Sequence, residues 1–276
     1  MTRVKFYAFP ALFALSVFVA GCDVSVGEHG FSMDVAAGKA QNEWTRSYTI
    51  AAGGRLEISN VNGTINASPG TGAQVEVRAE RIAKAGNDEA AQELLKKIEI
   101  VEEASADNVR IHTKVPKMSW GRSGHEVRYW VKVPKGLAVN FETVNGGVRL
   151  DNLDGQVVAS TTNGGVRGKG LRGAVKASTT NGGVEVEMAA VTGEIDIETT
   201  NGGIRLNLPP DVKATVEARC TNGGITVDDS LGAVEVTEKS RRQFRGTLNG
   251  GGSRISAETT NGGIRIRGIG ERTETP

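Results

Sequence analysis

The tripeptide Asn-Gly-Gly recurs through the second half of the 276-residue chain and restricts its fold more than any other feature. It begins at Asn145, Asn163, Asn181, Asn201, Asn222, Asn249 and Asn261, and a degenerate copy stands at Asn62-Gly63. The first four steps are 18, 18, 20 and 21 residues long, whereas Asn222 and Asn261 are 39 residues apart, with Asn249 out of register between them. Such spacing is typical of a repeat architecture in which each unit packs on its neighbours.

Small or apolar residues alternate with polar ones on both sides of each tripeptide. Thr179, Ala177 and Val175 precede Asn181 at alternate positions, and Val184 follows it. This period of two is typical of half-buried strands, so each unit is predicted to be a strand, a corner, a second strand and a looser loop. The predicted structural corners are Asn145, Asn163, Asn181, Asn201, Asn222 and Asn261.

The predicted fold class is all-β, a single-stranded β-solenoid with coils of about 18–21 residues. In a solenoid, equivalent strands stack in parallel, and the near-identity of equivalent positions favours it because like residues then form ladders. The alternative is an antiparallel meander or sandwich in which each Asn-Gly forms a hairpin turn. The asparagine side chains are expected to close the corners by hydrogen bonds to the backbone. Cys220 falls in an inward row and is expected to be buried and inert.

Residues 79–135 interrupt the repeat with one predicted helix and three predicted strands. Asn87 is a suitable helix N-cap, and Ala91, Leu94 and Leu95 would share one face of the helix. The strands are predicted over Ile98–Val101, Val109–Val115 and Glu126–Val133. The helix is expected to cover an open end or an edge of the β-structure, because exposed strand edges invite aggregation.

The first 21 residues have the pattern of a secretory signal. Arg3 and Lys5 precede an uncharged, mostly apolar run that ends in small residues. Val19-Ala20-Gly21-Cys22 resembles the lipobox of bacterial lipoproteins. That resemblance implies cleavage before Cys22, a diacylglycerol on its sulfur and further acylation, and therefore a lipid-anchored place in the bacterial cell envelope. The predicted organisation is a signal peptide (1–21), a tether (22–45), a first β repeat (46–78), the helix and strand insert (79–135), regular solenoid repeats (136–270) and a tail (271–276).

Three runs carry a resemblance to a known family. They are Glu142–Leu150 and Glu198–Leu206, which share Asn-Gly-Gly between two strands, and Val131–Gly136, which precedes them. Their order and spacing resemble the bacterial putative-adhesin domain of unknown function, over about residues 45–270. The resemblance implies strand repeats with an upstream helix insert, and it transfers no catalytic residues.

The outward positions contain one candidate ligand-facing row. Arg149, Arg167, Arg205 and Arg265 take one equivalent position, interrupted by Glu185 and Thr226. Stacked guanidinium groups could hold the phosphate or carboxylate groups of an acidic glycan. The alternative is a solvated face paired with Glu142, Glu187 and Glu198.

Other site chemistry is not predicted. The carboxylates do not recur in register, and His29, His112 and His125 are scattered, so no catalytic residue, metal or cofactor is expected. With 33 Lys and Arg against 32 Asp and Glu, the chain has no general attraction to nucleic acid.

The predicted function is a non-catalytic, membrane-anchored envelope lipoprotein, an adhesin-like or scaffold binding module. Its expected partners are the membrane, through the lipid on Cys22, and an envelope protein or glycan. One alternative is a polysaccharide-acting β-helix enzyme, and another is a structural or regulatory envelope module without a ligand.

Overall fold

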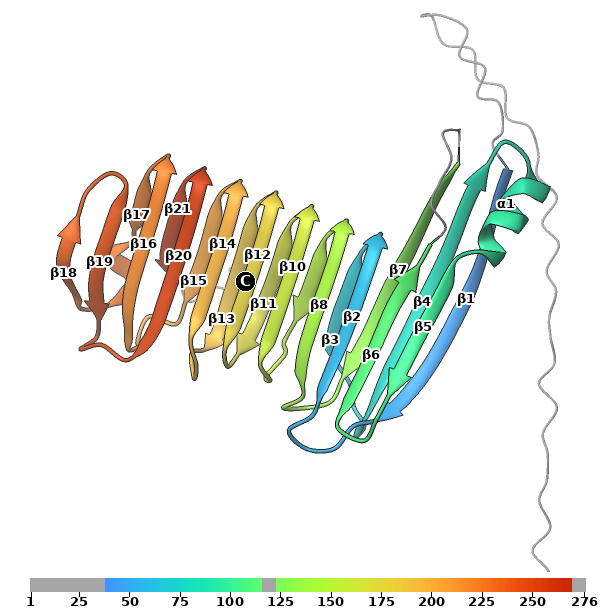
Figure 1. Ribbon diagram of the computed structural model, residues 1–276. Helices are drawn as coiled ribbons and strands as arrows, with labels where there is room; N and C mark the ends of the chain where they lie inside the picture. Colours follow the sequence, from blue (N-terminus) through green and yellow to red (C-terminus); the bar gives the residue numbers. More distant parts are fainter. Residues whose placement is uncertain (1–37, 116–122, 270–276) are drawn as a thin grey trace, which may run out of the picture. The chain divides into compact units, whose positions relative to one another are not determined.

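The computed structural model describes residues 38–115 and 123–269, and its strands form two sheets of ten and eleven strands (Figure 1). Sheet A contains, in spatial order, β1 (Gly38–Thr49), β4 (Gln74–Ala85), β7 (Gly124–Val133), β3 (Ile65–Pro69), β9 (Val148–Asp151), β11 (Val166–Arg172), β13 (Val184–Ala190), β15 (Ile204–Leu208), β21 (Ile264–Gly268) and β17 (Ile225–Val227). Sheet B contains β18 (Val234–Lys239), β19 (Gln243–Leu248), β16 (Ala214–Asn222), β20 (Ser253–Asn261), β14 (Ile195–Asn201), β12 (Val175–Asn181), β10 (Val157–Asn163), β8 (Ala138–Asn145), β2 (Arg55–Asn62), β6 (Asn108–Lys114) and β5 (Glu99–Ala104). The prediction of an all-β fold is confirmed.

Each repeat contributes one strand to each sheet. The strand before an Asn-Gly-Gly lies in sheet B and the strand after it in sheet A, so the corner is not a hairpin turn. Neighbouring repeats pair in parallel and in register, and Asn163 lies opposite both Asn145 and Asn181. The antiparallel alternative is therefore wrong for the repeats. Among the described strands, antiparallel pairs occur toward the two ends, as in β1–β4 and β16–β19.

The core lies between the two sheets and consists of the alternate residues predicted to face inward. Val175, Ala177 and Thr179 of β12 are buried, and so are Val184 and Val186 of β13. Full burial of a valine or isoleucine side chain stabilises the folded state by about 1.5–3 kcal/mol, so the stacked rows hold the sheets together. Cys220 is also buried, at 5% exposure, as its place in this pattern predicts.

The last two repeats do not stack in sequence order. β20 pairs with β14 on one side and with β16 on the other, and β21 lies between β15 and β17 in the same way. The chain leaves β17, passes through the 3₁₀ turn η1 (Asp229–Leu231) and forms the hairpin β18–β19, which pairs with the outer edge of β16. It then returns along the inner edge of β16. The expectation that successive coils stack on one another is therefore corrected here, because the hairpin already occupies the outer edge.

The predicted insert is present, with small differences at its boundaries. The helix α1 spans Asp88–Lys96, and the Asn87 side chain caps it by accepting a hydrogen bond of 2.8 Å from the Ala90 N–H. Ala91 packs against Ala40 of β1 and Ala85 of β4, so α1 lies against the edge of sheet A (Figure 1). The three predicted strands correspond to β5, β6 and β7.

The predicted tether is corrected from Gly38 onward. Gly38–Thr49 forms β1, which pairs with β4 along its whole length, from Gly38 opposite Ala85 to Thr49 opposite Gln74. The Tyr48 hydroxyl donates to the Glu102 carboxylate, and Arg46 Nε lies 3.3 Å from Oε1 of the same carboxylate. These contacts join β1 at the edge of sheet A to β5 at the edge of sheet B. The predicted signal peptide, Cys22 and the predicted tail lie outside the described residues.

Candidate functional site

The first glycine of each in-register Asn-Gly-Gly corner is required by the close stacking of the repeats. A Cβ atom on Gly164 would lie 2.0 Å from the carbonyl oxygen of Gly146, and one on Gly182 would lie 1.9 Å from that of Gly164. The backbone pairing continues through the corner, since Gly164 N donates to Asn181 O over 3.0 Å. Every corner therefore leaves bare backbone where other strands would carry a side chain.

The corner asparagines bond to one another and not to the backbone, which corrects the expectation from the sequence. In each pair the Nδ2 of one asparagine donates to the Oδ1 of the next, over 2.7–2.9 Å. We call this line the asparagine ladder, and it runs Asn222, Asn261, Asn201, Asn181, Asn163, Asn145 and Asn62, in the direction of donation. The parallel register places equivalent residues one strand apart, about 4.8 Å, which is a distance that a pair of amides can bridge.

The inward threonines supply the side-chain bonds to the backbone. Thr161 Oγ1 donates to the Gly146 carbonyl over 2.8 Å, and Thr179 does the same to Gly164. Cys220 takes this position in β16, and its Sγ lies 3.9 Å from the Arg241 carbonyl oxygen. Each threonine thus ties its own strand to the corner of the neighbouring repeat.

His125 receives the last bond of the asparagine ladder. Its Nε2 lies 2.8 Å from Asn62 Nδ2, and because an amide nitrogen only donates, Nε2 must be the unprotonated nitrogen. Its Nδ1 is buried and has no hydrogen-bond partner among the described residues. Burial lowers the pKa of His125 below its ordinary value, which agrees with a neutral imidazole in this place.

The four candidate arginines lie in one row on sheet A. Arg149 is opposite Arg167, which is opposite Glu185, and Glu185 is opposite Arg205. Arg205 is in turn opposite Arg265, because β21 lies next to β15. The sequence order would have placed Thr226 between these last two arginines, but Thr226 lies beyond Arg265 at the end of the row. The structure therefore contains two arginine pairs separated by a single glutamate.

The two arginine pairs differ in whether a carboxylate forms an ion pair with them. Arg167 Nε lies 3.2 Å from the Glu185 carboxylate. Arg205 and Arg265 are exposed, and neither has a hydrogen-bond or ion-pair partner in residues 38–115 or 123–269. The predicted partners Glu142, Glu187 and Glu198 form no ion pair with the row, and Glu142 and Glu198 lie on sheet B. Glu185 is therefore the single carboxylate that lies in the row and partly neutralises its positive charge.

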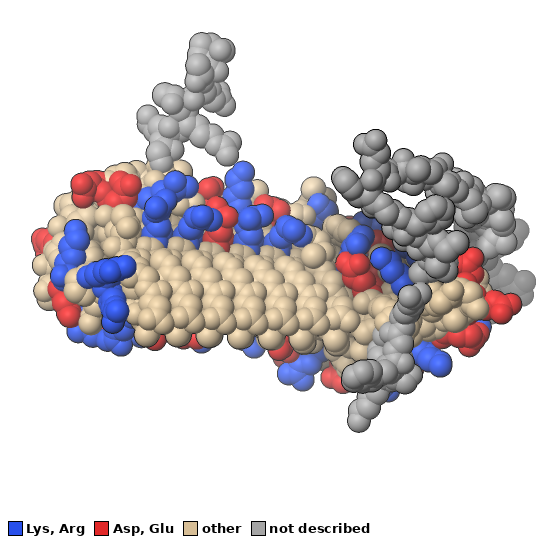
Figure 2. Space-filling model, turned by 90° about the horizontal axis from the view of Figure 1, so that it is seen from above, with Lys and Arg blue, Asp and Glu red and all other residues tan. Residues whose placement is uncertain are grey.

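A shallow groove runs between the arginine row and the corners. One stretch has a volume of about 350 Å³ and is lined by Gly147, Val148, Arg149, Gly165, Val166, Arg167, Gly183, Val184, Glu185, Gly203 and Arg205. A second stretch shares Gly183, Gly203 and Arg205 with the first and continues it past Arg265 to Thr226. In the view onto the corners, an uncharged strip runs along the molecule with basic side chains gathered beside it (Figure 2). We call this feature the glycine groove.

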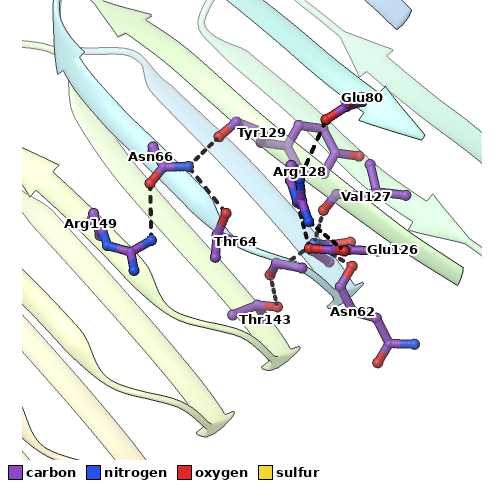
Figure 3. Close-up of polar contacts among 12 residues, drawn as sticks. Asn62, Thr64, Asn66, Glu80, Glu126, Val127, Arg128, Tyr129, Thr143 and Arg149 are labelled. Atoms are coloured by element: carbon purple, nitrogen blue, oxygen red, sulfur yellow. Dashed lines mark hydrogen bonds and ion pairs between the residues drawn. The ribbon is translucent and has the colours of Figure 1, made fainter. Parts of the chain in front are cut away.

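The row of arginines ends where the repeats meet β7. The Asn66 side chain accepts a hydrogen bond of 3.5 Å from Arg149 and donates to Thr64 Oγ1 and the Tyr129 carbonyl (Figure 3). Trp130 is the next residue in register, and the Arg78 guanidinium lies 4.0 Å from the centre of its ring. These contacts occupy the polar groups at this end, so the accessible part of the row begins at Arg149.

The outer face of sheet B has a different charge pattern. Some acidic side chains on β14 and β16 pair with basic neighbours, as in Lys176–Asp196 at 3.1 Å and Arg245–Glu217 at 2.9 Å. The hydrogen bond from Arg245 is the main cause of a lowered pKa at Glu217. Glu198 on β14 and Glu258 on β20 lie opposite each other, and neither forms an ion pair in the described residues, so unpaired like charges occur on this face as well.

Neither a cluster of metal ligands nor a membrane-spanning helix occurs in the described part of the chain. It contains no group of three or more His, Cys, Asp or Glu side chains placed to hold a metal ion. Its one α-helix and its 3₁₀ turn are both too short to cross a membrane.

The fold and this surface define a class of β-repeat proteins in which two sheets meet at Asn-Gly-Gly corners. Residues 135–267 match the family described as Toastrack DUF4097. The predicted resemblance to a bacterial putative-adhesin domain of unknown function is thereby confirmed. None of the curated proteins compared with the chain matches it.

One solved structure supports the fold. A putative cell adhesion protein from Clostridium sporogenes ATCC 15579 superposes with a TM-score of 0.51 at 12% identity, over 83% of this chain and 100% of that one. A putative adhesin from Bacteroides fragilis NCTC 9343 gives a TM-score of 0.41 at 10% identity, over 83% and 97% of the two chains. At such identities the first likeness concerns the fold alone, and the second is too distant to add to it.

Proposed function

We propose that this chain is a non-catalytic envelope lipoprotein whose repeats form a β-solenoid and bind an anionic ligand along the glycine groove. The observation that carries the proposal is the arginine row, in which Arg205 and Arg265 lie side by side and form no ion pair in the described residues, although Asp228 is close enough to attract Arg265. Like charges opposite each other on a sheet destabilise it, so a row of this kind is best explained by a ligand that supplies the missing negative charge.

The groove does not have the side chains of a glycosidase. Hydrolysis of a glycoside ordinarily needs two carboxyl groups flanking the bond, one acting as an acid and the other as a base or nucleophile. Among the groove's lining residues Glu185 is the single carboxylate, and it is held by Arg167. We therefore favour a binding protein over an enzyme that cleaves polysaccharide. We also favour it over a structural or regulatory module that has no ligand.

The lipid anchor at Cys22 is part of the same proposal and rests on the lipobox pattern. Two or three acyl chains hold a protein firmly at a membrane, where a stiff stack of repeats would present the groove to its surroundings. Replacement Cys22→Ser should release the protein into the soluble fraction after cell lysis. Continued sedimentation of the variant with membranes would contradict the anchor without affecting the binding proposal.

Binding can be tested with envelope fractions from the native cells. The full-length protein should be retained by these fractions, and the variant Arg149→Ser/Arg167→Ser/Arg205→Ser/Arg265→Ser should be retained much less. The matched control is Arg219→Ser/Arg254→Ser, which removes exposed arginines from sheet B and should bind normally. Equal retention of all three proteins would overturn the role of the arginine row.

A further inference from the structure

We propose that the ligand of the glycine groove is a linear acidic polysaccharide that lies across the strands, with its carboxylates on the two arginine pairs. This rests on the proposed binding function and specifies the class of ligand. The groove is continuous from Arg149 to Thr226, so it fits a polymer better than a small anion. Its two sides are built from different chemical groups, and each of them suits one part of an acidic sugar.

The arginine side of the groove suits carboxylates. A guanidinium presents planar N–H donors that match a carboxylate in a two-point contact. The pair Arg149–Arg167 and the pair Arg205–Arg265 are separated by the strand that carries Glu185. Their centres are therefore three strand spacings apart, about 14 Å. A polymer long enough to reach both pairs gains from two contacts on one chain.

The asparagine ladder suits hydroxyl groups. In each repeat the chain passes from the asparagine through two glycines and an inward valine or isoleucine to the arginine position, so the ladder runs along the corners beside the residues that line the groove. An amide has two N–H donors and two acceptor lone pairs, and the ladder uses one of each. Each exposed asparagine thus keeps one donor and one acceptor for solvent or ligand. Sugar hydroxyls both donate and accept, so a saccharide can use both groups at every strand.

The floor of the groove disfavours a peptide. Peptide recognition by strand addition requires unpaired backbone N–H and C=O groups at a sheet edge. Here the floor belongs to the middle of the stack, and its backbone is already paired, as in the bond from Val148 N to Gly165 O over 3.1 Å. An extended peptide would have to bind through its side chains alone.

A lipid surface and a nucleic acid fit less well. Val144 and Val236 are the exposed large hydrophobic residues of the described chain, and neither lines the groove. The valines and isoleucines that do line it are buried, so the groove has no exposed apolar side chain to insert into a bilayer. Single-stranded nucleic acids are bound by stacking on aromatic side chains, and no aromatic residue lines either stretch of the groove.

The test uses the full-length protein in detergent and polygalacturonate, a linear polymer with one carboxylate on each sugar. Neutral dextran, polyaspartate and phosphatidylglycerol vesicles serve as comparison probes for uncharged sugar, acidic polypeptide and lipid. The vesicles should bind through the lipid on Cys22 to the same extent with and without the arginines, and dextran and polyaspartate should bind little. Isothermal titration should show binding of polygalacturonate that weakens as salt is added. Arg205→Ser/Arg265→Ser should weaken it about tenfold or more, because charge-assisted hydrogen bonds are lost. The sheet B control Arg219→Ser/Arg254→Ser should leave it unchanged.

The length of the oligomer provides a second criterion. An octamer of galacturonate can reach both arginine pairs, whereas a dimer can reach only one, so the octamer should bind far more tightly than the dimer. This difference should disappear in Arg205→Ser/Arg265→Ser. Equal binding of the two oligomers by the unaltered protein would overturn the placement of the polymer across the strands.

The remaining outcomes separate this inference from the function on which it rests. Arginine-dependent binding of polyaspartate or of vesicles, without binding of polygalacturonate, would overturn the polysaccharide while leaving the groove as a binding site. Failure to bind any of the acidic probes, together with arginine-independent retention by envelope fractions, would overturn both.

Discussion

Arg205 and Arg265 lie directly opposite each other on β15 and β21, although the whole segment from β16 to β20 separates them in sequence. Their proximity results from the order of the last two repeats. Had the repeats stacked in sequence order, Thr226 would stand between them. The return of β20 and β21 to the stack therefore brings together two positive charges that come from different repeats.

The Arg205–Arg265 pair should lower the stability of the protein. Removing one charge by Arg265→Ser relieves a repulsion between neighbours, so we expect the thermal midpoint to rise slightly at low salt and the gain to vanish near 1 M salt. Arg245→Ser is the contrasting variant, because Arg245 contacts both Glu217 and Glu238 and its loss should lower the midpoint. Scanning calorimetry at two salt concentrations checks both. A loss of stability in Arg265→Ser would indicate a structural role for that arginine.

The corner glycines should be intolerant of even one methyl group. Gly182→Ala would place a Cβ atom 1.9 Å from the Gly164 carbonyl oxygen, so the repeats would have to separate. We expect a destabilisation of more than about 3 kcal/mol, or failure to fold. Gly86→Ala is the matched control, since no atom lies within 4 Å of a Cβ there. Urea unfolding of the two variants gives the comparison, and similar midpoints would contradict the steric argument.

The asparagine ladder should contribute to stability through its amides. Asn181→Ala removes two hydrogen bonds, one to Asn163 and one from Asn201, and should cost about 1–2 kcal/mol. Thr180→Ala changes the neighbouring exposed side chain, which makes no ladder bond, and should be close to neutral. The free energy of unfolding in urea measures the difference between them. A neutral effect of Asn181→Ala would mean that solvent replaces the ladder bonds without loss.

The inward threonine row should be separable into a packing part and a hydrogen-bond part. Thr179→Val keeps the shape of the side chain but leaves the Gly164 carbonyl without the hydroxyl that donates to it over 2.8 Å. The cost should be about 1 kcal/mol. Thr179→Ser retains the donor and loses a methyl group, so its loss of stability reports packing alone. If Thr179→Val proved as stable as the unaltered protein, the bond would be of no energetic consequence.

His125 should make stability depend on pH. Burial lowers its pKa in the folded state, so the unfolded chain takes up a proton first as the pH falls. The contribution of neutral His125 is present above the unfolded pKa of about 6.5 and is lost as the pH falls through the lower folded value. Protonation also removes the lone pair that accepts from Asn62. Unfolding free energies of the unaltered protein and of His125→Asn, measured from pH 7.5 downward, should converge, and parallel curves would contradict this.

The sequence was sufficient for the corners and for the inward rows. Asn-Gly-Gly recurs where only glycine fits against the neighbouring carbonyl, and period-two alternation marks Val175, Ala177 and Thr179 as buried. It was also sufficient to place Arg149 beside Arg167, because their repeats are consecutive and equal in length.

Features that depend on distant pairing were not predictable in the same way. Gly38–Thr49 is mostly exposed, so its sequence lacks the apolar alternation of a strand, and only the partner β4 makes it one. The 39-residue interval before Asn261 was compatible with two more coils in order, whereas the hairpin β18–β19 takes the outer edge of β16. The sequence likewise left the partner of each asparagine amide undetermined, because backbone and side-chain acceptors both lie within reach at a corner.

The exchanged order of the last repeats also limits how the protein can be assembled as its chain is synthesised. Repeats from β8–β9 to β14–β15 can add one after another to a growing stack, since each finds its neighbour already in place. β16 and β17 can take their final places only after β20 and β21 have been made, because these C-terminal strands lie between them and β14–β15. The final repeat, β20 and β21, therefore joins β16 and β17 to the rest of the stack. A chain that stops short of Ser253 would contain a folded N-terminal stack and a C-terminal end that is not attached to it.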